Sequence, residues 1–175
     1  MSVNTVDERL AGQWQFNAVH SSADFSIKYL VAKFRGRFEE LDASLNDGVL
    51  TGSVKVGSVN VKDPNLIGHL QSPDFFDAEQ HPEITFASKI LEIDGDNLTL
   101  DGELTLKGIT KPVQATGTVN GPTEDFMGNT RLGFTLQTTI NRTDFGVTWN
   151  AELPKGGKAL SEEVTLIIEL EFHKV

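Results

Sequence analysis

Long runs of alternating apolar and polar residues dominate this chain. Along 98–106, leucine or glycine occupies every even position, and threonine or an acidic residue occupies every odd one. Because successive side chains of a strand point to opposite faces of a sheet, this period of two predicts strands with one buried face. Similar runs occur at 13–19, 25–31, 33–44, 49–59, 84–93, 112–119, 131–140 and 164–172. We therefore predict an all-β domain of about eight or nine strands.

Pairs of residues that favour tight turns separate several of these runs. They are Asp47-Gly48, Asp94-Gly95, Asn120-Gly121 and Gly156-Gly157. Asp-Gly and Asn-Gly supply the positive φ angles of short hairpins, so we expect sequence neighbours to run antiparallel. Closing such a sheet removes its exposed edges, which favours an antiparallel eight-stranded barrel. A two-sheet sandwich would show the same alternation.

One short segment has the signals of a helix. Asp63 is a typical N-cap residue, and Pro64 suits the first helical position. An apolar stripe at helical spacing follows, formed by Leu66, Ile67 and Leu70. We predict one short helix near residues 63–72, within a single domain that spans 1–175.

The composition argues against several classes of protein. The chain has 175 residues, a length typical of one domain. It lacks the run of about 18 apolar residues that a membrane helix requires, so we expect no integral membrane segment. It has no cysteine, which excludes disulfides and thiolate chemistry. The net charge of −10 argues against nucleic acid and anionic lipid surfaces as main partners.

The start of the chain, residues 1–11, is polar. It lacks the basic-then-apolar layout of a secretion signal. We therefore expect a cytoplasmic location, or a periplasmic one if a signal has been removed.

Several short sequence blocks occur in a fixed order over nearly the whole chain. They are Trp14, His20-Ser21, Phe25-Ser26-Ile27-Lys28, and the segments 35–38, 69–77, 81–86, 104–113 and 141–147. Through these blocks the chain resembles the YceI-like family, bacterial lipocalin-like proteins associated with polyisoprenoid binding. The resemblance implies an eight-stranded antiparallel barrel, a helix near one end, and a long apolar tunnel that holds an isoprenoid chain. The chain departs from the family pattern at Asn17, Tyr29 and Ile67-Gly68, where relatives carry more polar groups.

Candidate ligand-binding residues are those expected to line the lumen or a barrel end. The apolar candidates are Phe25, Ile27, Phe34, Phe38, Leu66, Leu70, Phe75, Phe76, Phe86, Phe134, Ile140 and Phe145. The polar candidates are His20, His69 and Arg142. An eight-stranded barrel is just wide enough for packed side chains or one small ligand, and the resemblance favours the ligand. The histidines lack the spacing of a zinc site, so we expect no metal. We also expect no cofactor and no catalytic residue.

Two groups of charged residues have simple structural interpretations. Lys28, Lys33, Arg35 and Arg37 could meet a pyrophosphate, but three of them alternate with Phe34, Gly36 and Phe38. If the phenylalanines face inward, these cations face solvent. Arg142 and Asp144 flank Thr143, and we expect an ion pair between them that holds a strand end.

Three functions are compatible with the sequence. The favoured one is a non-catalytic carrier that holds a long-chain isoprenoid, of polyprenyl or isoprenoid-quinone type, or a similar amphipathic lipid. The second is a hydrolase or isomerase inside the barrel, for which His20, Ser21 and Asp144 are the candidate polar set. The third is a protein-interaction module. A homodimer is compatible with the first and third.

Overall fold

The computed structural model describes residues 7–175, which are mostly β-strand. In chain order the strands are β1 (Gln13–Phe16), β2 (Ser22–Tyr29), β3 (Ala32–Phe38), β4 (Leu41–Asn46), β5 (Val49–Lys55), β6 (Val59–Val61), β7 (Glu83–Asp94), β8 (Asn97–Leu106), β9 (Ile109–Glu124), β10 (Thr130–Asn141) and β11 (Leu160–Lys174). One α-helix, α1 (Ile67–Gln71), lies between β6 and β7. The short 3-10 helices are η1 (Glu8–Leu10), η2 (Ala18–His20), η3 (Val56–Ser58), η4 (Pro64–Leu66) and η5 (Arg142–Phe145).

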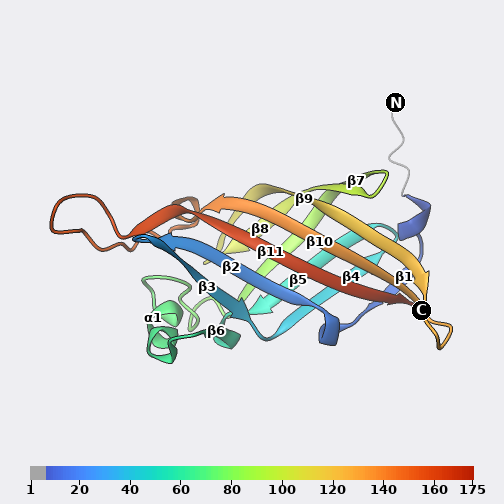
Figure 1. Ribbon diagram of the computed structural model, residues 1–175, viewed down its shortest axis with the longest axis horizontal. Coiled ribbons are helices and arrows are strands. Elements are labelled where there is room, and N and C mark those ends of the chain that lie inside the picture. Colours follow the sequence, from blue (N-terminus) through green and yellow to red (C-terminus); the bar gives the residue numbers. More distant parts are fainter. Residues whose placement is uncertain (1–6) are drawn as a thin grey trace.

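Eight strands form a closed antiparallel ring. Their order is β1-β4-β5-β7-β8-β9-β10-β11, and the pairing of β11 with β1 closes the ring. Figure 1 shows the long strands β8 to β11 running side by side along the barrel. The predicted eight-stranded antiparallel barrel is confirmed, and the sandwich is excluded.

The remaining strands extend the barrel at one end. β2 continues the direction of β1 after η2 and pairs with both β11 and β3. β3 pairs in turn with β6, which is the outermost strand of this branch. The segment after β6 carries α1, which packs against β6. The helix therefore lies beside the edge of the sheet at this end of the barrel (Figure 1).

The predicted helix near 63–72 is confirmed, with a 3-10 turn as its beginning. The Asp63 side chain accepts a hydrogen bond of 3.0 Å from the backbone N–H of Asn65, and Pro64 is the first residue of η4. α1 follows directly and buries Leu70. The N-cap and the proline therefore act as the sequence predicts.

Most of the predicted turns are present, but one is wrong. Asp47-Gly48 and Asp94-Gly95 join hairpins, and Gly156-Gly157 lies in the loop before β11. Asn120-Gly121 lies inside β9. The positive φ of Gly121, +94°, serves a local irregularity of the strand pair, where the β9–β10 register shifts between Arg131 and Gly133.

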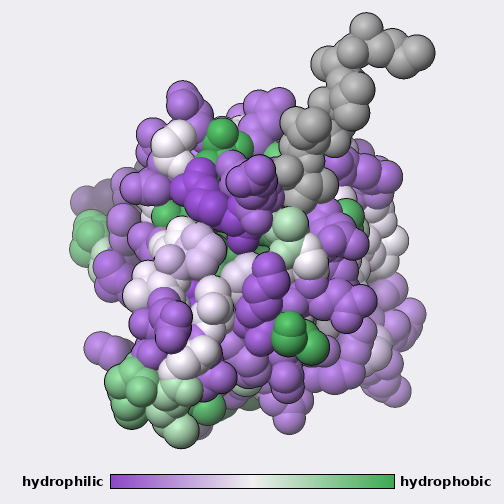
Figure 2. All heavy atoms as spheres, turned by 90° about the vertical axis from the view of Figure 1, so that its right-hand side faces the viewer, coloured by the Kyte–Doolittle hydropathy of each residue, from purple (hydrophilic) through white to green (hydrophobic). Residues whose placement is uncertain are grey.

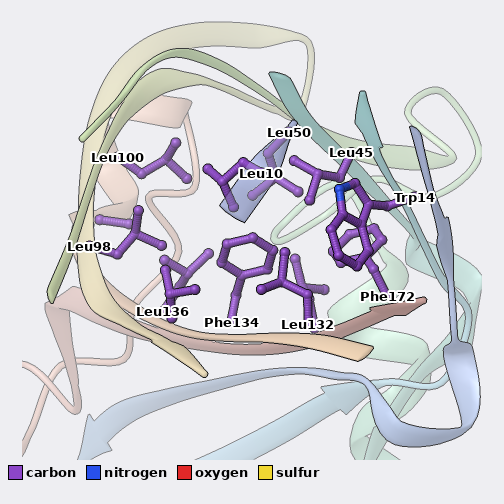
Figure 3. Close-up of a cluster of buried hydrophobic side chains, with 13 residues drawn as sticks. Leu10, Trp14, Leu45, Leu50, Leu98, Leu100, Leu132, Phe134, Leu136 and Phe172 are labelled. Carbon is purple, nitrogen blue, oxygen red and sulfur yellow. The ribbon is translucent and has the colours of Figure 1, made fainter. Parts of the chain in front are cut away.

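The barrel is tightly filled at the end that carries η1 and the C-terminus. Figure 3 shows side chains from several strands meeting inside it, with Trp14, Phe134 and Phe172 among them. Leu10 comes from η1, outside the ring of strands, and is 1% exposed within this cluster. Seen from outside, the same end is largely hydrophilic (Figure 2). We call it the closed end.

Candidate functional site: an apolar cavity in the barrel

The other part of the barrel interior encloses a cavity of about 550 Å³. The inward side chains of β11 show the change from filled to hollow. Leu170 and Phe172 are buried, whereas Val164, Leu166 and Ile168 are only partly buried although they too face the interior. A side chain that faces inward and still has accessible surface must border an empty space. The cavity therefore begins where the closed-end cluster stops.

Aromatic rings form much of the cavity wall. Phe25 of β2 and Phe38 of β3 lie 5.6 Å apart between ring centroids, and Phe76 lies 6.0 Å from Phe25. The Phe25 ring occupies the space above Gly36, where a Cβ atom would lie 2.3 Å from Phe25 Cζ. Gly36 is therefore required for this ring position. The resulting wall is apolar and closely packed.

A second aromatic group marks the place where the cavity reaches the surface. His69 of α1 lies 4.7 Å from Trp149 and 4.9 Å from Phe75, centroid to centroid. His69 Nε2 is also 3.0 Å from Asp74 Oδ2. Leu66 and Tyr29 line the same cavity and are exposed to solvent. We call this end, next to α1 and the loop before β11, the mouth.

Arg142 is the buried cation of the cavity. It is 3% exposed, and its Nε donates to Ser161 O at 2.8 Å. Its Nη1 donates to Val147 O at 2.9 Å and to Trp149 O at 2.8 Å. Burial lowers the pKa of the guanidinium, and the nearby Glu162 carboxylate opposes this shift. Arginine nevertheless keeps its charge in proteins, so the cavity contains one fixed positive group.

The predicted ion pair between Arg142 and Asp144 is wrong. No carboxylate within residues 7–175 forms an ion pair with Arg142, and Asp144 is exposed. The cause is local geometry. Residues three apart lie on the same side of a 3-10 helix, so η5 buries Arg142 together with Phe145 and leaves Asp144 outside.

Most of the predicted ligand-binding residues line the cavity. These are Phe25, Ile27, Phe34, Phe38, Leu66, His69, Leu70, Phe75, Phe76, Phe86, Ile140 and Arg142. Three do not: Phe134 packs in the closed-end cluster, Phe145 is a buried residue of η5 in a separate apolar cluster, and His20 lies on the outside of the barrel. The lining also includes residues that the sequence analysis did not select, among them Tyr29, Ile84, Trp149, Val164 and Leu166.

The candidate catalytic set is not assembled. His20 Nδ1 is 2.5 Å from Glu171 Oε2, and the Ser21 hydroxyl accepts from the Glu171 N–H at 3.0 Å. Asp144 follows β10, whose last residue pairs with Glu163. Glu163 and Glu171 are separated by about 26 Å along an extended strand. Residues 7–175 also contain no cluster of three or more His, Asp or Glu side chains that could hold a metal ion.

The predicted outward direction of Lys33, Arg35 and Arg37 is confirmed. Lys28, Lys33, Arg35 and Arg37 are exposed on the outer face of the β2–β3 hairpin. Arg37 Nε donates to Asp24 Oδ1 at 2.8 Å. These side chains therefore do not reach into the lumen.

Comparison with known proteins agrees with this architecture. The family model of the YceI-like domain matches residues 14–172. The chain belongs to the YceI-like family. A UPF0312 protein of Staphylococcus aureus strain MSSA476 is 31% identical to it over 166 residues, which cover 90% of this chain and 95% of that protein. A second UPF0312 protein, from strain MW2, matches it with the same identity and coverage.

Solved structures share the fold of this YceI-like protein. BcnA of Burkholderia cenocepacia aligns with a TM-score of 0.77 at 21% identity, over 90% of this chain and 99% of that chain. A YceI protein of Campylobacter jejuni aligns at 0.72 and 26% identity, over 83% and 87% of the two chains. A polyisoprenoid binding domain from Saccharophagus degradans aligns at 0.72 and 14% identity, over 93% and 98%. Within residues 7–175, no helix is long and apolar enough to cross a membrane.

Proposed function

We propose that this protein is a non-catalytic carrier whose barrel cavity holds a long-chain isoprenoid of polyprenyl or isoprenoid-quinone type, or a similar amphipathic lipid. The observation that carries the proposal is the apolar cavity of about 550 Å³ inside the barrel. Its volume falls in the range of about 300–1,000 Å³ that is common for small-molecule sites. The family membership, and the polyisoprenoid binding domain among the structural neighbours, favour an isoprenoid ligand.

The energetics of burial favour recognition through the hydrocarbon tail. Burying one five-carbon isoprene unit contributes about 3–4 kcal/mol, at about 0.8 kcal/mol per carbon. A few units therefore supply most of the binding free energy that non-covalent complexes reach. The polar end of the ligand then determines the direction in which the ligand lies in the cavity, and contributes less to the affinity.

Arg142 is the group that we assign to the polar end of the ligand. The hydrogen bonds of Arg142 to protein use Nε and Nη1, and Nη2 makes none within residues 7–175. Nη2 is also absent from the buried polar atoms that lack a partner, so it retains accessible surface. Because Arg142 lines the cavity, Nη2 can donate to an oxygen of a phosphate, hydroxyl or quinone. The tail would then extend towards Leu100 and Leu136 at the inner end of the cavity.

The carrier proposal is tested by extraction and reloading. The purified protein is extracted with organic solvent and the extract is analysed by mass spectrometry for long aliphatic molecules. The extracted protein is then titrated with a polyprenyl phosphate and with an isoprenoid quinone. The chain has two tryptophans, and a Trp14→Phe variant leaves Trp149 at the mouth as the only one. We expect ligand to change its fluorescence. An empty extract together with no uptake of either lipid would contradict the proposal.

The homodimer stays a prediction. Sedimentation equilibrium of the loaded and the extracted protein measures its mass in solution, and a monomer in both forms would contradict it.

A further inference from the structure

The tip of the β2–β3 hairpin exposes a group of apolar side chains. Val31 is 100% exposed, and Tyr29 and Leu30 are also exposed. Leu30 adopts a positive φ of +54° to make the turn, although it carries a bulky side chain. Neither Leu30 nor Val31 is needed to fill the barrel interior. The tip is therefore an apolar surface that the fold of the chain does not explain.

This tip lies beside the mouth of the cavity. The Leu30 N–H donates to Ala159 O at 2.9 Å, and Tyr29 pairs with Leu160 at the start of β11. Tyr29 and Leu160 themselves line the cavity. In Figure 1 the β2–β3 turn and the loop before β11 project at the end opposite the C-terminus. A binding partner that contacts the tip would therefore lie directly at the mouth of the cavity.

The charge around the tip differs in sign from that of the whole chain. Residues 25–38 contain Lys28, Lys33, Arg35 and Arg37 and no acidic residue. The adjoining segment 153–159 adds Lys155 and Lys158, again without an acidic residue.

Acidic groups begin at the margins of this surface. They are Asp24, which is paired with Arg37, and the exposed Asp63, Glu152, Glu162 and Glu163. The hairpin tip and the segment 153–159 together are positive, whereas the chain carries −10.

We propose that this surface docks the protein on a lipid bilayer that contains anionic lipids. Leu30 and Val31 enter the interfacial region, and Lys28, Lys33 and Lys155 contact lipid phosphates. Interfacial binding strengthens with the apolar area that is buried and with the attraction of lysines to anionic lipids. The net charge of −10 describes the whole chain and not this surface. Charges farther than about 8–10 Å from the membrane are screened at physiological ionic strength, so the local positive charge decides the interaction.

Docking at this end rests on the proposed carrier function and explains how the carrier receives its ligand. A long prenyl chain has little solubility in water, so a carrier has to receive it from a membrane. With the mouth held against the bilayer, the chain can enter the cavity between Tyr29 and Leu66 without full exposure to water. The binding of vesicles is nevertheless measurable without any ligand in the cavity.

A second apolar tip provides a matched control. Phe126 is 99% exposed and Met127 is 75% exposed in the turn between β9 and β10. That turn follows Glu124 and Asp125 and lies at the closed end, near the C-terminus (Figure 1). Its two apolar side chains are together more exposed than Leu30 and Val31, but its immediate sequence neighbours are acidic and it is far from the cavity. The proposal therefore assigns membrane contact to one tip and not to the other.

The experiment is vesicle flotation with the full chain. Vesicles of phosphatidylcholine alone are compared with vesicles that also contain phosphatidylglycerol, at low and at high salt. We expect the wild-type protein to float with the anionic vesicles at low salt. The double variant Leu30→Ser/Val31→Ser should lose at least about tenfold in binding, since two buried apolar side chains are removed. The double variant Phe126→Ser/Met127→Ser should bind like the wild type.

Several results would overturn the docking proposal. They are no flotation of the wild type, equal flotation with neutral vesicles, or equal losses in the two double variants. Loading with a polyprenyl phosphate from detergent separates this proposal from the carrier function. The Leu30→Ser/Val31→Ser variant should load normally from detergent and slowly from vesicles. If the protein binds vesicles but takes up no polyprenyl phosphate, the docking proposal is supported and the carrier function is contradicted.

Discussion

Arg142 holds Trp149 in place through a hydrogen bond of 2.8 Å from Nη1 to the backbone carbonyl of Trp149. Trp149 in turn contacts His69 of α1, so one buried guanidinium connects the end of β10 with the mouth of the cavity. The same side chain also binds the carbonyls of Val147 and Ser161. The loop between β10 and β11 is thereby anchored from inside the barrel.

Replacing Arg142 with Met should destabilise the protein. The change leaves carbonyl acceptors of the loop without their donor, which costs about 1–3 kcal/mol for a buried group. Arg142→Lys keeps the charge but cannot reproduce the planar arrangement of N–H donors. Its free energy of unfolding should therefore lie between those of the wild type and of Arg142→Met. Urea unfolding measures the free energies, and Trp149 fluorescence should shift to the red as the mouth loosens. A Met variant with unchanged stability and spectrum would contradict this anchoring role.

Gly36 should be intolerant of even a methyl group. In Gly36→Ala the new Cβ would lie 2.3 Å from Phe25 Cζ, so the ring or the strand has to move. Overpacking of this kind typically costs about 1–3 kcal/mol. Gly52→Ala is the control, because Gly52 also lies in a strand but its Cβ would meet nothing closer than 3.7 Å. Thermal unfolding of both variants tests the difference. Equal midpoints would show that the Phe25 ring moves away at little cost.

The periodicity of the strands predicted an all-β domain and its inward faces, but it did not by itself separate a barrel from a sandwich. It could not distinguish hollow from filled regions, because both have the same alternation. Phe86 and Phe134 both face inward, yet Phe86 lines the cavity and Phe134 is packed in the closed-end cluster. The difference depends partly on Leu10, which enters that cluster from η1, outside the strands. Such long-range packing leaves no local signal.

Other differences have local causes that the sequence analysis missed. The run 13–19 was predicted as one strand, but β1 ends at Phe16 because the Asn17 side chain caps η2 by accepting from Val19 N–H at 3.2 Å. Val164 and Leu166 line the cavity and could have been selected from the alternation of β11. Trp149 lies in no strand or helix, so no periodicity indicates its place at the mouth.

The ion pair between Asp125 and Arg131 should make stability depend on acid pH. Hydrogen bonds from Arg131, and then from the backbone of Asn129, lower the pKa of Asp125 from 3.8 to about 2. A carboxyl group whose pKa is lower in the folded state stabilises the protein above pH 3.8, and this contribution is lost as the pH falls towards 2. Asp125→Asn should therefore be less stable than wild type at neutral pH, with the difference shrinking below about pH 4. Urea midpoints across this pH range test it, and a difference independent of pH would contradict it.

Filling part of the cavity should weaken lipid binding without unfolding the barrel. Leu166 faces the cavity from β11, and a Trp there would occupy space that the ligand needs. Because the wall at this position borders a void, the larger side chain has room that a packed core would not provide. We expect Leu166→Trp to weaken the binding of a polyprenyl phosphate by at least about tenfold, equivalent to losing two buried carbons.

Ile167→Trp is the matched control for this substitution. Ile167 is the next residue of the same strand, is 38% exposed and does not line the cavity, so its replacement should leave uptake unchanged. Circular dichroism and thermal unfolding confirm that both variants remain folded, and fluorescence titration measures binding. If Leu166→Trp binds the lipid as well as Ile167→Trp does, the ligand does not lie in the lumen. The apolar surfaces outside the barrel would then be the place to look for it.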